Sequence, residues 1–186
     1  MTHWRKRVVA LLVTSYSLLV TIFGCGYTTR SMISDKYRTI YVAPFANKVD
    51  ITNESYASGK YRVYRPMLDS DITKSVRNKF LLDGNLRPAS EETADLILKG
   101  ELIEFRRDPL RYDDSGEVVS EYRLNLVCNL SLLEGDENRL VWEEKGFTGD
   151  TTYFTSGFQA KSEDTAVNDA LSDLARRIVE RTVEQW

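Results

Sequence analysis

Histidine is almost absent from this sequence. The one histidine is His3, and it stands within the first few residues of the chain. Nucleophile systems of the Ser-His-Asp and Cys-His kinds use an imidazole as their base, and zinc sites in proteins are commonly built with histidine. Glycine-rich phosphate-binding loops are absent as well. We therefore predict no enzyme activity, no catalytic residues, no metal site and no cofactor, although chemistry based on carboxylates or lysine alone remains open.

The sequence also has no excess of positive charge. It holds 25 Lys and Arg residues against 28 Asp and Glu residues, and its formal net charge is −3. Residues 1–24 hold three basic residues, Arg5, Lys6 and Arg7, and no acidic residue, so the chain without this segment is more acidic still. Because binding to nucleic acid requires a basic face, we predict no nucleic-acid partner.

A hydrophobic run long enough to span a membrane is missing too. The longest apolar stretch runs from Val8 to Phe23 and is interrupted by Ser, Thr and Tyr, whereas a spanning helix needs roughly 20 apolar residues. A basic start, a short apolar core and the small residue Gly24 are typical of a signal peptide. We predict a lipoprotein signal peptide over residues 1–24.

Cys25 follows directly, and the stretch Ile22-Phe23-Gly24-Cys25 resembles the bacterial lipobox, although Phe23 stands where a small residue is usual. A cysteine thiolate is the nucleophile that can take up a diacylglycerol, so Cys25 is the predicted lipidation site. The alternative is an ordinary signal peptide or an anchor helix with an incidental cysteine. Gly26 rather than Asp follows, which by resemblance to enterobacterial sorting rules favours the outer membrane.

Cysteine is scarce, and with Cys25 acylated only Cys128 is left. No intramolecular disulfide is then possible. Because Cys128 lies on the apolar face of an alternating segment, we expect a buried, inert thiol; a reactive or intermolecular thiol is the alternative.

Hydrophobic periodicity predicts two helices and four strands in the remainder. A stripe at four-residue spacing favours a helix from Pro66 to Asp83, and a second helix is predicted over about 163–184 with Ser162 as its N-cap. Strict alternation over 122–132 is typical of a half-buried strand. Further strands are predicted over 37–45, 94–105, with Gly100 as a possible bulge position, and 139–154, with a long loop over 47–65 and a turn-rich connection over 106–117.

This order predicts an α+β fold: a two-layer sandwich with two helices on one face of a four-stranded, largely antiparallel sheet. We expect a lipidated leader over 25–36, followed by a single domain over 37–186.

Few charged clusters stand out as sites. Arg106, Arg107 and Arg111 gather at one end of a predicted hairpin, and arginine forks bind phosphates well; a solvated charged tip is the alternative. The acidic run over 113–117 lacks the alternating register of a calcium loop and is better explained as a turn. Glu101 and Glu104 are expected on opposite faces of their strand.

Taken together, the motifs resemble the LPS-assembly lipoprotein family LptE. The segments that carry the resemblance are Cys25-Gly26-Tyr27, Ile40-Tyr-Val-Ala-Pro-Phe-Ala-Asn47, Phe80-Leu-Leu-Asp-Gly-Asn-Leu86, Ala94-Asp-Leu-Ile-Leu-Lys-Gly-Glu-Leu102, Glu121-Tyr-Arg-Leu-Asn-Leu126 and Leu140-Val-Trp142, followed by the C-terminal helix. One segment departs from the family pattern, because Pro66-Met67-Leu68-Asp69 follows the long 47–65 loop where a short turn is usual.

The resemblance implies an outer-membrane lipoprotein on the periplasmic side, held by its acyl anchor. It implies that the domain sits as a plug inside an LptD-type β-barrel, helps that barrel assemble and helps lipopolysaccharide reach the cell surface. It also implies contacts between lipopolysaccharide and basic residues, for which Arg106, Arg107 and Arg111 are the candidates by charge. A lipoprotein adaptor for another envelope machine, such as a secretin pilot or a cell-wall synthase regulator, is the alternative.

Overall fold

A computed structural model of the chain describes residues 36–50, 65–135 and 137–183. The chain divides into two compact units, Met1–Arg30 and Ser31–Trp186, and every described residue belongs to the second. The predicted signal peptide, the lipidation site Cys25, nearly all of the leader and most of the 47–65 loop lie outside the described residues. Within the described ranges, no helix combines the length and the apolar character needed to cross a membrane.

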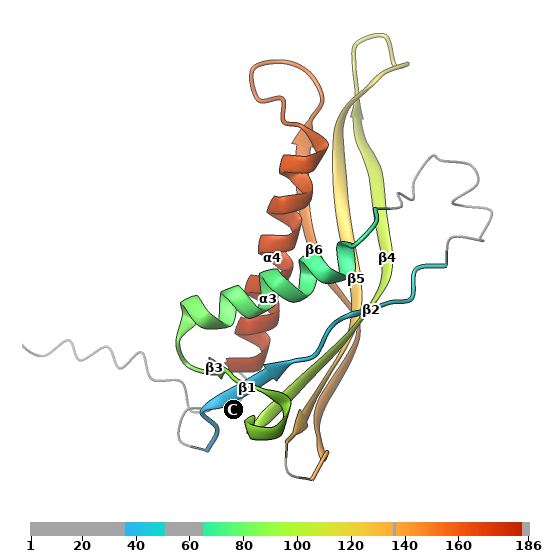
Figure 1. The fold of residues 1–186 in the computed structure, drawn as a ribbon. Coiled ribbons are helices and arrows are strands. Elements are labelled where there is room, and N and C mark those ends of the chain that lie inside the picture. The colour runs from blue at the N-terminus through green and yellow to red at the C-terminus, as the bar shows by residue number, and fades with distance from the viewer. Residues whose placement is uncertain (1–35, 51–64, 136, 184–186) are drawn as a thin grey trace, which may run out of the picture. The chain divides into compact units, whose positions relative to one another are not determined.

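The described residues form two α-helices and a mixed sheet (Figure 1). The elements in chain order are β1 (Thr39–Val42), β2 (Ala46–Asn47), α3 (Leu68–Asp83), β3 (Arg87–Pro88), a 3₁₀ turn (Glu91–Thr93), β4 (Leu96–Tyr112), β5 (Val119–Glu134), β6 (Leu140–Phe154) and α4 (Glu163–Val183).

The sheet differs from the expected one in strand number and direction. Its order is β3-β1-β4-β5-β6, and the short β2 also pairs with β4, which makes six strands among the described residues. β4, β5 and β6 are antiparallel as predicted, but β1 runs parallel to both β3 and β4, and β2 runs parallel to β4. The prediction of four largely antiparallel strands is therefore slightly wrong. The connection from β1 to β4 passes through α3, and such a crossover returns the chain in the same direction.

Helix α3 begins at Leu68, two residues after the predicted start at Pro66. Met67, with φ 60°, precedes it in the left-handed region and supplies no side-chain cap. Gly84 follows the last turn with φ 80°, a conformation that glycine adopts without a Cβ penalty, and so ends the helix where predicted. The predicted apolar stripe is buried and consists of Leu68, Ile72, Val76 and Phe80.

Helix α4 begins at Glu163, and Ser162 caps it as predicted. The backbone N–H of Thr165 donates to the Ser162 hydroxyl at 3.2 Å. The helix packs tightly on β6 at Gly149, where a Cβ atom would lie only 2.4 Å from the Cβ of Leu174. Glycine at this position therefore allows the backbone of β6 to approach the helix closely.

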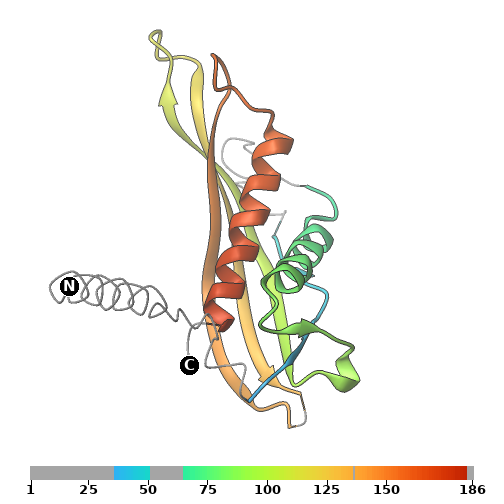
Figure 2. The same cartoon turned by 90° about the vertical axis from the view of Figure 1, so that its left-hand side faces the viewer.

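The core lies between the sheet and both helices. The predicted alternation of β5 is confirmed, since its inward residues are at most 1% exposed: Leu124, Leu126, Cys128, Leu130 and Leu132. These side chains join the buried residues of α3 and α4 in one cluster. Both helices therefore cover the same face of the sheet, as predicted (Figure 2).

Strand β4 is longer than the sequence indicated. It continues to Tyr112 and pairs with β5 up to Val119, so the expected turn-rich connection over 106–117 is wrong for residues 106–112. The turn itself occupies only residues 113–118. The physical reason is that this part of the sheet is only half-buried. Its ladder is maintained by cross-strand pairing between polar side chains, and apolar alternation does not reveal it.

A bulge in β4 changes which side chains share a face. The register with β5 shifts between Leu102 and Glu104. As a result Glu101 lies opposite Asn129 and Glu104 opposite Val127, and the expectation that the two glutamates point to opposite faces is wrong. Gly100 is not the bulge residue; the Phe45 ring lies against it, where a Cβ would be 2.1 Å away.

Candidate functional site

The three candidate arginines lie on the half of β4 that leads to the β4–β5 turn. Arg106 and Arg107 are consecutive in the strand and pair with Asn125 and Leu124 of β5. Because successive side chains of a strand point to opposite faces, these two guanidinium groups lie on different sides of the sheet. Arg111 is farther along and pairs with Glu121. The structure therefore does not bring the three side chains together into one clamp.

Arg107 lies on the face that carries the helices. Its Nη1 is 2.5 Å from Oε2 of Glu163, the first residue of α4. The guanidinium also stacks over the Tyr122 ring at 4.8 Å, and the Tyr153 hydroxyl donates to the same Glu163 carboxylate at 3.3 Å. Burial alone would lower the pKa of Arg107, but Glu163 and Tyr153 together outweigh it and raise that pKa. These contacts indicate that Arg107 joins β4 to the start of α4.

Arg106 lies on the opposite face among polar neighbours. Its Nε donates to Asp108 at 2.8 Å, its Nη1 is 3.3 Å from Glu104, and Asn125 donates to the same Asp108 carboxylate at 2.9 Å. The hydrogen bond from Arg106 to Asp108 raises the pKa of Arg106. Both acids compete with any phosphate for this guanidinium.

Arg111 is the most accessible of the three. Its side chain is 66% exposed, and its Nη2 is 3.6 Å from Glu121, a distance longer than a hydrogen bond. The guanidinium lies 5.8 Å from the centroid of the Phe154 ring. An incoming anion can therefore reach Arg111 with less competition than it would meet at Arg106 or Arg107.

Large apolar side chains are exposed at the same end of the domain. Phe158, in the loop between β6 and α4, is 105% exposed. Three more belong to the β4–β5 hairpin: Leu110, Tyr112 and Val118. Sequence reasoning missed this surface because residues 106–117 were expected to form a turn-rich connection, so the part of β4 that presents Leu110 and Tyr112 was not predicted. The signal was present, since apolar residues flank the acidic turn on both sides.

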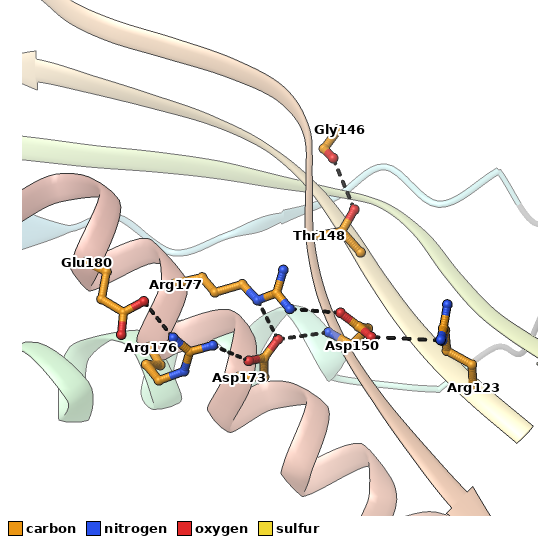
Figure 3. A network of polar contacts seen from close by, with 8 residues as sticks. All are labelled: Arg123, Gly146, Thr148, Asp150, Asp173, Arg176, Arg177 and Glu180. Atoms are coloured by element: carbon orange, nitrogen blue, oxygen red, sulfur yellow. Dashed lines mark hydrogen bonds and ion pairs between the residues drawn. The ribbon is translucent and has the colours of Figure 1, made fainter. Parts of the chain in front are cut away.

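A second polar network fastens α4 to the edge strand β6 (Figure 3). Arg177 reaches from the helix to Asp150 of β6 at 3.0 Å and to Asp173 at 2.7 Å. The Asp173 carboxylate in turn accepts the backbone N–H of Asp150 at 3.1 Å. Burial alone would raise the pKa of Asp173, but these partners and Arg176 lower it. The network gives the backbone N–H of Asp150, on the edge strand β6, a hydrogen-bond acceptor. It also ties α4 to this strand through Arg177.

The opposite end of the domain is held together around Glu134. Its carboxylate accepts hydrogen bonds from Lys36 at 2.8 Å, from Arg139 at 2.6 Å and from the Tyr37 hydroxyl. The hydrogen bond from Arg139, with those from Lys36 and Tyr37, lowers the pKa of Glu134 to about 2. The start of β1 is therefore tied to the β5–β6 turn, close to the point where the predicted leader ends.

Hollows in the described surface are open and shallow. One of them is a groove of about 600 Å³ between the two helices. It is lined by Ser75, Asn78, Lys79, Leu82, Ser172, Asp173, Ala175 and Arg176. No converging set of polar groups around an enclosed apolar cavity, as small-molecule sites show, lies in this groove.

Reactive groups are also limited in the described part of the chain. Cys128 is a free, buried thiol as predicted, and desolvation raises its pKa to about 12. Its neutral thiol cannot act as a nucleophile near neutral pH. No group of three or more His, Cys, Asp or Glu side chains that could hold a metal ion lies within the described ranges.

These features define a class of protein before any comparison. The described domain is a helix-covered mixed sheet with partly exposed charge pairs at its element junctions and exposed apolar side chains at one end. Such an arrangement suits an interaction domain.

Comparison with known families identifies the class more closely. The family model LptE, described as "Lipopolysaccharide-assembly", matches residues 37–182. The chain belongs to this family, and the resemblance noted in its motifs is confirmed. No curated protein matches the chain in sequence.

Solved structures similar to the chain share little sequence identity with it. Protein XCC0632 from Xanthomonas campestris is 17% identical, with a TM-score of 0.53 over 78% of this chain and 84% of that one. An uncharacterized lipoprotein B from Nitrosomonas europaea is 12% identical, with a TM-score of 0.48 over 79% and 83%. A PelC variant from Paraburkholderia phytofirmans, a dodecamer, is 16% identical, with a TM-score of 0.46 over 81% and 89%. At 17% identity, the similarity to XCC0632 concerns the fold alone.

Proposed function

We propose that this chain is an outer-membrane lipoprotein that plugs an LptD-type β-barrel, assists its assembly and helps deliver lipopolysaccharide to the cell surface. The observation that carries the proposal is the family match over residues 37–182, which covers the described domain from β1 almost to the end of α4. In this account the protein is not an enzyme. Its acyl anchor at Cys25 holds it on the periplasmic face of the outer membrane.

The described domain has properties that support a plug. Charged side chains at the junctions between elements are paired with one another, as Arg107 is with Glu163 and Arg177 with Asp150. Helix α4 is fixed to the sheet by close packing at Gly149. A partner that folds around such a domain meets a surface that needs little ordering on binding, which lowers the entropic cost of association.

Depletion of the lipoprotein in its own cells tests the proposed function. We expect loss of correctly assembled barrel and loss of newly made lipopolysaccharide from the cell surface, both restored by the wild-type chain. A Cys25→Ser chain, which cannot be acylated, should restore both less well. Normal barrel and surface lipopolysaccharide after depletion, together with a failed secretin or cell-wall synthase, would instead support the adaptor function.

Arg111 is our first candidate for a contact with lipopolysaccharide phosphates, with Arg106 and Arg107 as further candidates. The order follows exposure and competition, since Arg111 is 66% exposed and lies beside a single carboxylate. We expect Arg111→Ala to weaken binding of the mature lipoprotein to purified lipopolysaccharide several-fold. Arg139→Ala is the matched control, because Arg139 is 62% exposed and also pairs with a glutamate. Equal binding by both variants and the wild type would remove Arg111 from the proposal.

A further inference from the structure

Exposed apolar side chains are distributed unevenly over the described domain. Eight large ones are exposed, and four of them belong to the β4–β5 hairpin and the β6–α4 loop. These four are Leu110, Tyr112, Val118 and Phe158, and together we call them the apolar end. Single exposed apolar residues are ordinary on protein surfaces, whereas several gathered at one place mark an interaction site.

The hairpin and the loop that carry the apolar end are joined by backbone contacts. The N–H of Thr155 donates to the carbonyl of Ser120 at 3.1 Å, and the Thr155 hydroxyl donates to the carbonyl of Val119 at 2.9 Å. Ala160 of the loop forms a β-bridge with Phe154, the last residue of β6. Figures 1 and 2 both show the hairpin tip and the loop at the same end of the sheet. The apolar end is therefore presented by connected segments.

The turn of the hairpin is itself held in one conformation. The N–H of Asp113 donates to the carbonyl of Val118 at 2.8 Å, and the N–H of Gly116 donates to the carbonyl of Asp113 at 2.9 Å. The Ser115 hydroxyl donates to the Asp113 carboxylate at 2.6 Å. Because this backbone is already ordered, a partner that binds the apolar end pays little conformational entropy.

Charge determines which partner fits this surface. Residues 110–121 hold four acidic side chains and one arginine, and that arginine, Arg111, lies beside one of the acids, Glu121. The remaining acids, Asp113, Asp114 and Glu117, surround the turn and are exposed. These three acids make the turn negative, whereas Arg111, the candidate contact for a lipopolysaccharide phosphate, precedes the turn on β4. The negative turn complements an apolar pocket bordered by lysine or arginine.

We propose that the apolar end is a docking surface for a protein partner whose pocket is apolar and has a basic border. The inference rests on the proposed function and names the part of this chain through which the LptD-type barrel is bound. Phe158 and Tyr112 are the anchors, since large aromatic side chains dominate the binding energy of protein interfaces.

The test compares Phe158→Ala with Leu82→Ala in binding of the mature lipoprotein to purified barrel in mild detergent. Leu82 is a matched control because it is 81% exposed but lies on α3, away from the apolar end. We expect about a tenfold weaker Kd for Phe158→Ala, as for an interface anchor, and no change for Leu82→Ala. Unchanged thermal melting of both variants shows that folding is intact.

The other outcomes separate the two proposals. If the wild-type lipoprotein does not bind the barrel, the proposed function fails and this inference fails with it. If the wild type binds and Phe158→Ala binds equally well, only the apolar end is overturned as the docking surface. Flotation of a Cys25→Ser chain with neutral phosphatidylcholine vesicles, lost in Phe158→Ala, would overturn it in favour of a lipid surface.

A charge reversal tests the basic border independently. Asp114→Lys combined with Glu117→Lys changes exposed side chains of the turn. We expect weaker binding to the barrel and a smaller decrease of affinity with added salt, because screening acts on attraction between opposite charges. Tighter binding by the double variant would contradict a basic border on the partner.

Discussion

Substitution of Gly149 by alanine tests the close contact between α4 and β6. The backbone of Gly149 does not lie in the left-handed region, so any residue can adopt its conformation. In an open position Gly→Ala would stabilise a protein by about 0.4–1 kcal/mol, because it restricts the unfolded chain. The sign of the effect therefore depends on whether the added methyl group fits.

The structure leaves no room for this methyl group. A Cβ on residue 149 would lie 2.4 Å from the Cβ, 2.5 Å from the Cα and 2.7 Å from the N of Leu174, whereas ordinary contacts are 3.4–4 Å. These are atoms close to the helix backbone, so α4 must move by roughly 1 Å. Overpacking of this kind costs about 1–3 kcal/mol and occasionally more. We expect a net loss of about 2 kcal/mol.

Urea unfolding, monitored by circular dichroism, measures this loss. The urea concentration at the midpoint should fall, while the slope of the unfolding free energy against urea stays similar. Leu174→Ala is the matched control. Alanine at position 174 keeps the N, Cα and Cβ atoms that a Cβ on residue 149 would meet. In the Gly149→Ala background it should therefore not restore stability. A stability of Gly149→Ala equal to or above the wild type would refute the close approach of α4 to β6.

Three further predictions concern the buried core and the end of the sheet at Glu134. Phe80→Ala, at a side chain that is 0% exposed, should lower the free energy of unfolding by about 3–5 kcal/mol in the same assay. Cys128 should react with iodoacetamide only in denaturant, since burial raises its pKa to about 12; rapid native labelling would contradict this. Because the folded pKa of Glu134 is about 2, below its ordinary 4.5, its stabilisation is present above pH 4.5 and is lost as the pH falls towards 2. The difference in Tm between wild type and Glu134→Gln should therefore shrink over that range, and a constant difference would show that the hydrogen bonds to Glu134 do not depend on its charge.

Periodicity predicted the elements that bury a continuous apolar face. The stripe of α3 and the alternation of β5 are read directly from residue spacing, and both are buried as expected. Glycine and serine at the helix ends also marked the boundaries well, since Gly84 ends α3 and Ser162 caps α4. Local chemistry was sufficient for these elements.

Features that depend on long-range pairing were not visible in the sequence. The parallel direction of β1 and the extension of β4 to Tyr112 are set by partners far away in the chain. The three candidate arginines are close to one another in the sequence. In the structure, the alternation of side chains along β4 places Arg106 and Arg107 on opposite faces of the sheet. The bonds of Glu134 to Lys36 and Arg139 likewise appear only once the strands are paired.

The most direct test of the account is the composition of the complex that the lipoprotein forms in its own membranes. The tagged mature protein would be purified in mild detergent and its companions quantified by mass spectrometry. The account predicts an LptD-type β-barrel in equimolar amount. A secretin or a cell-wall synthase in that amount, with no barrel, would contradict it.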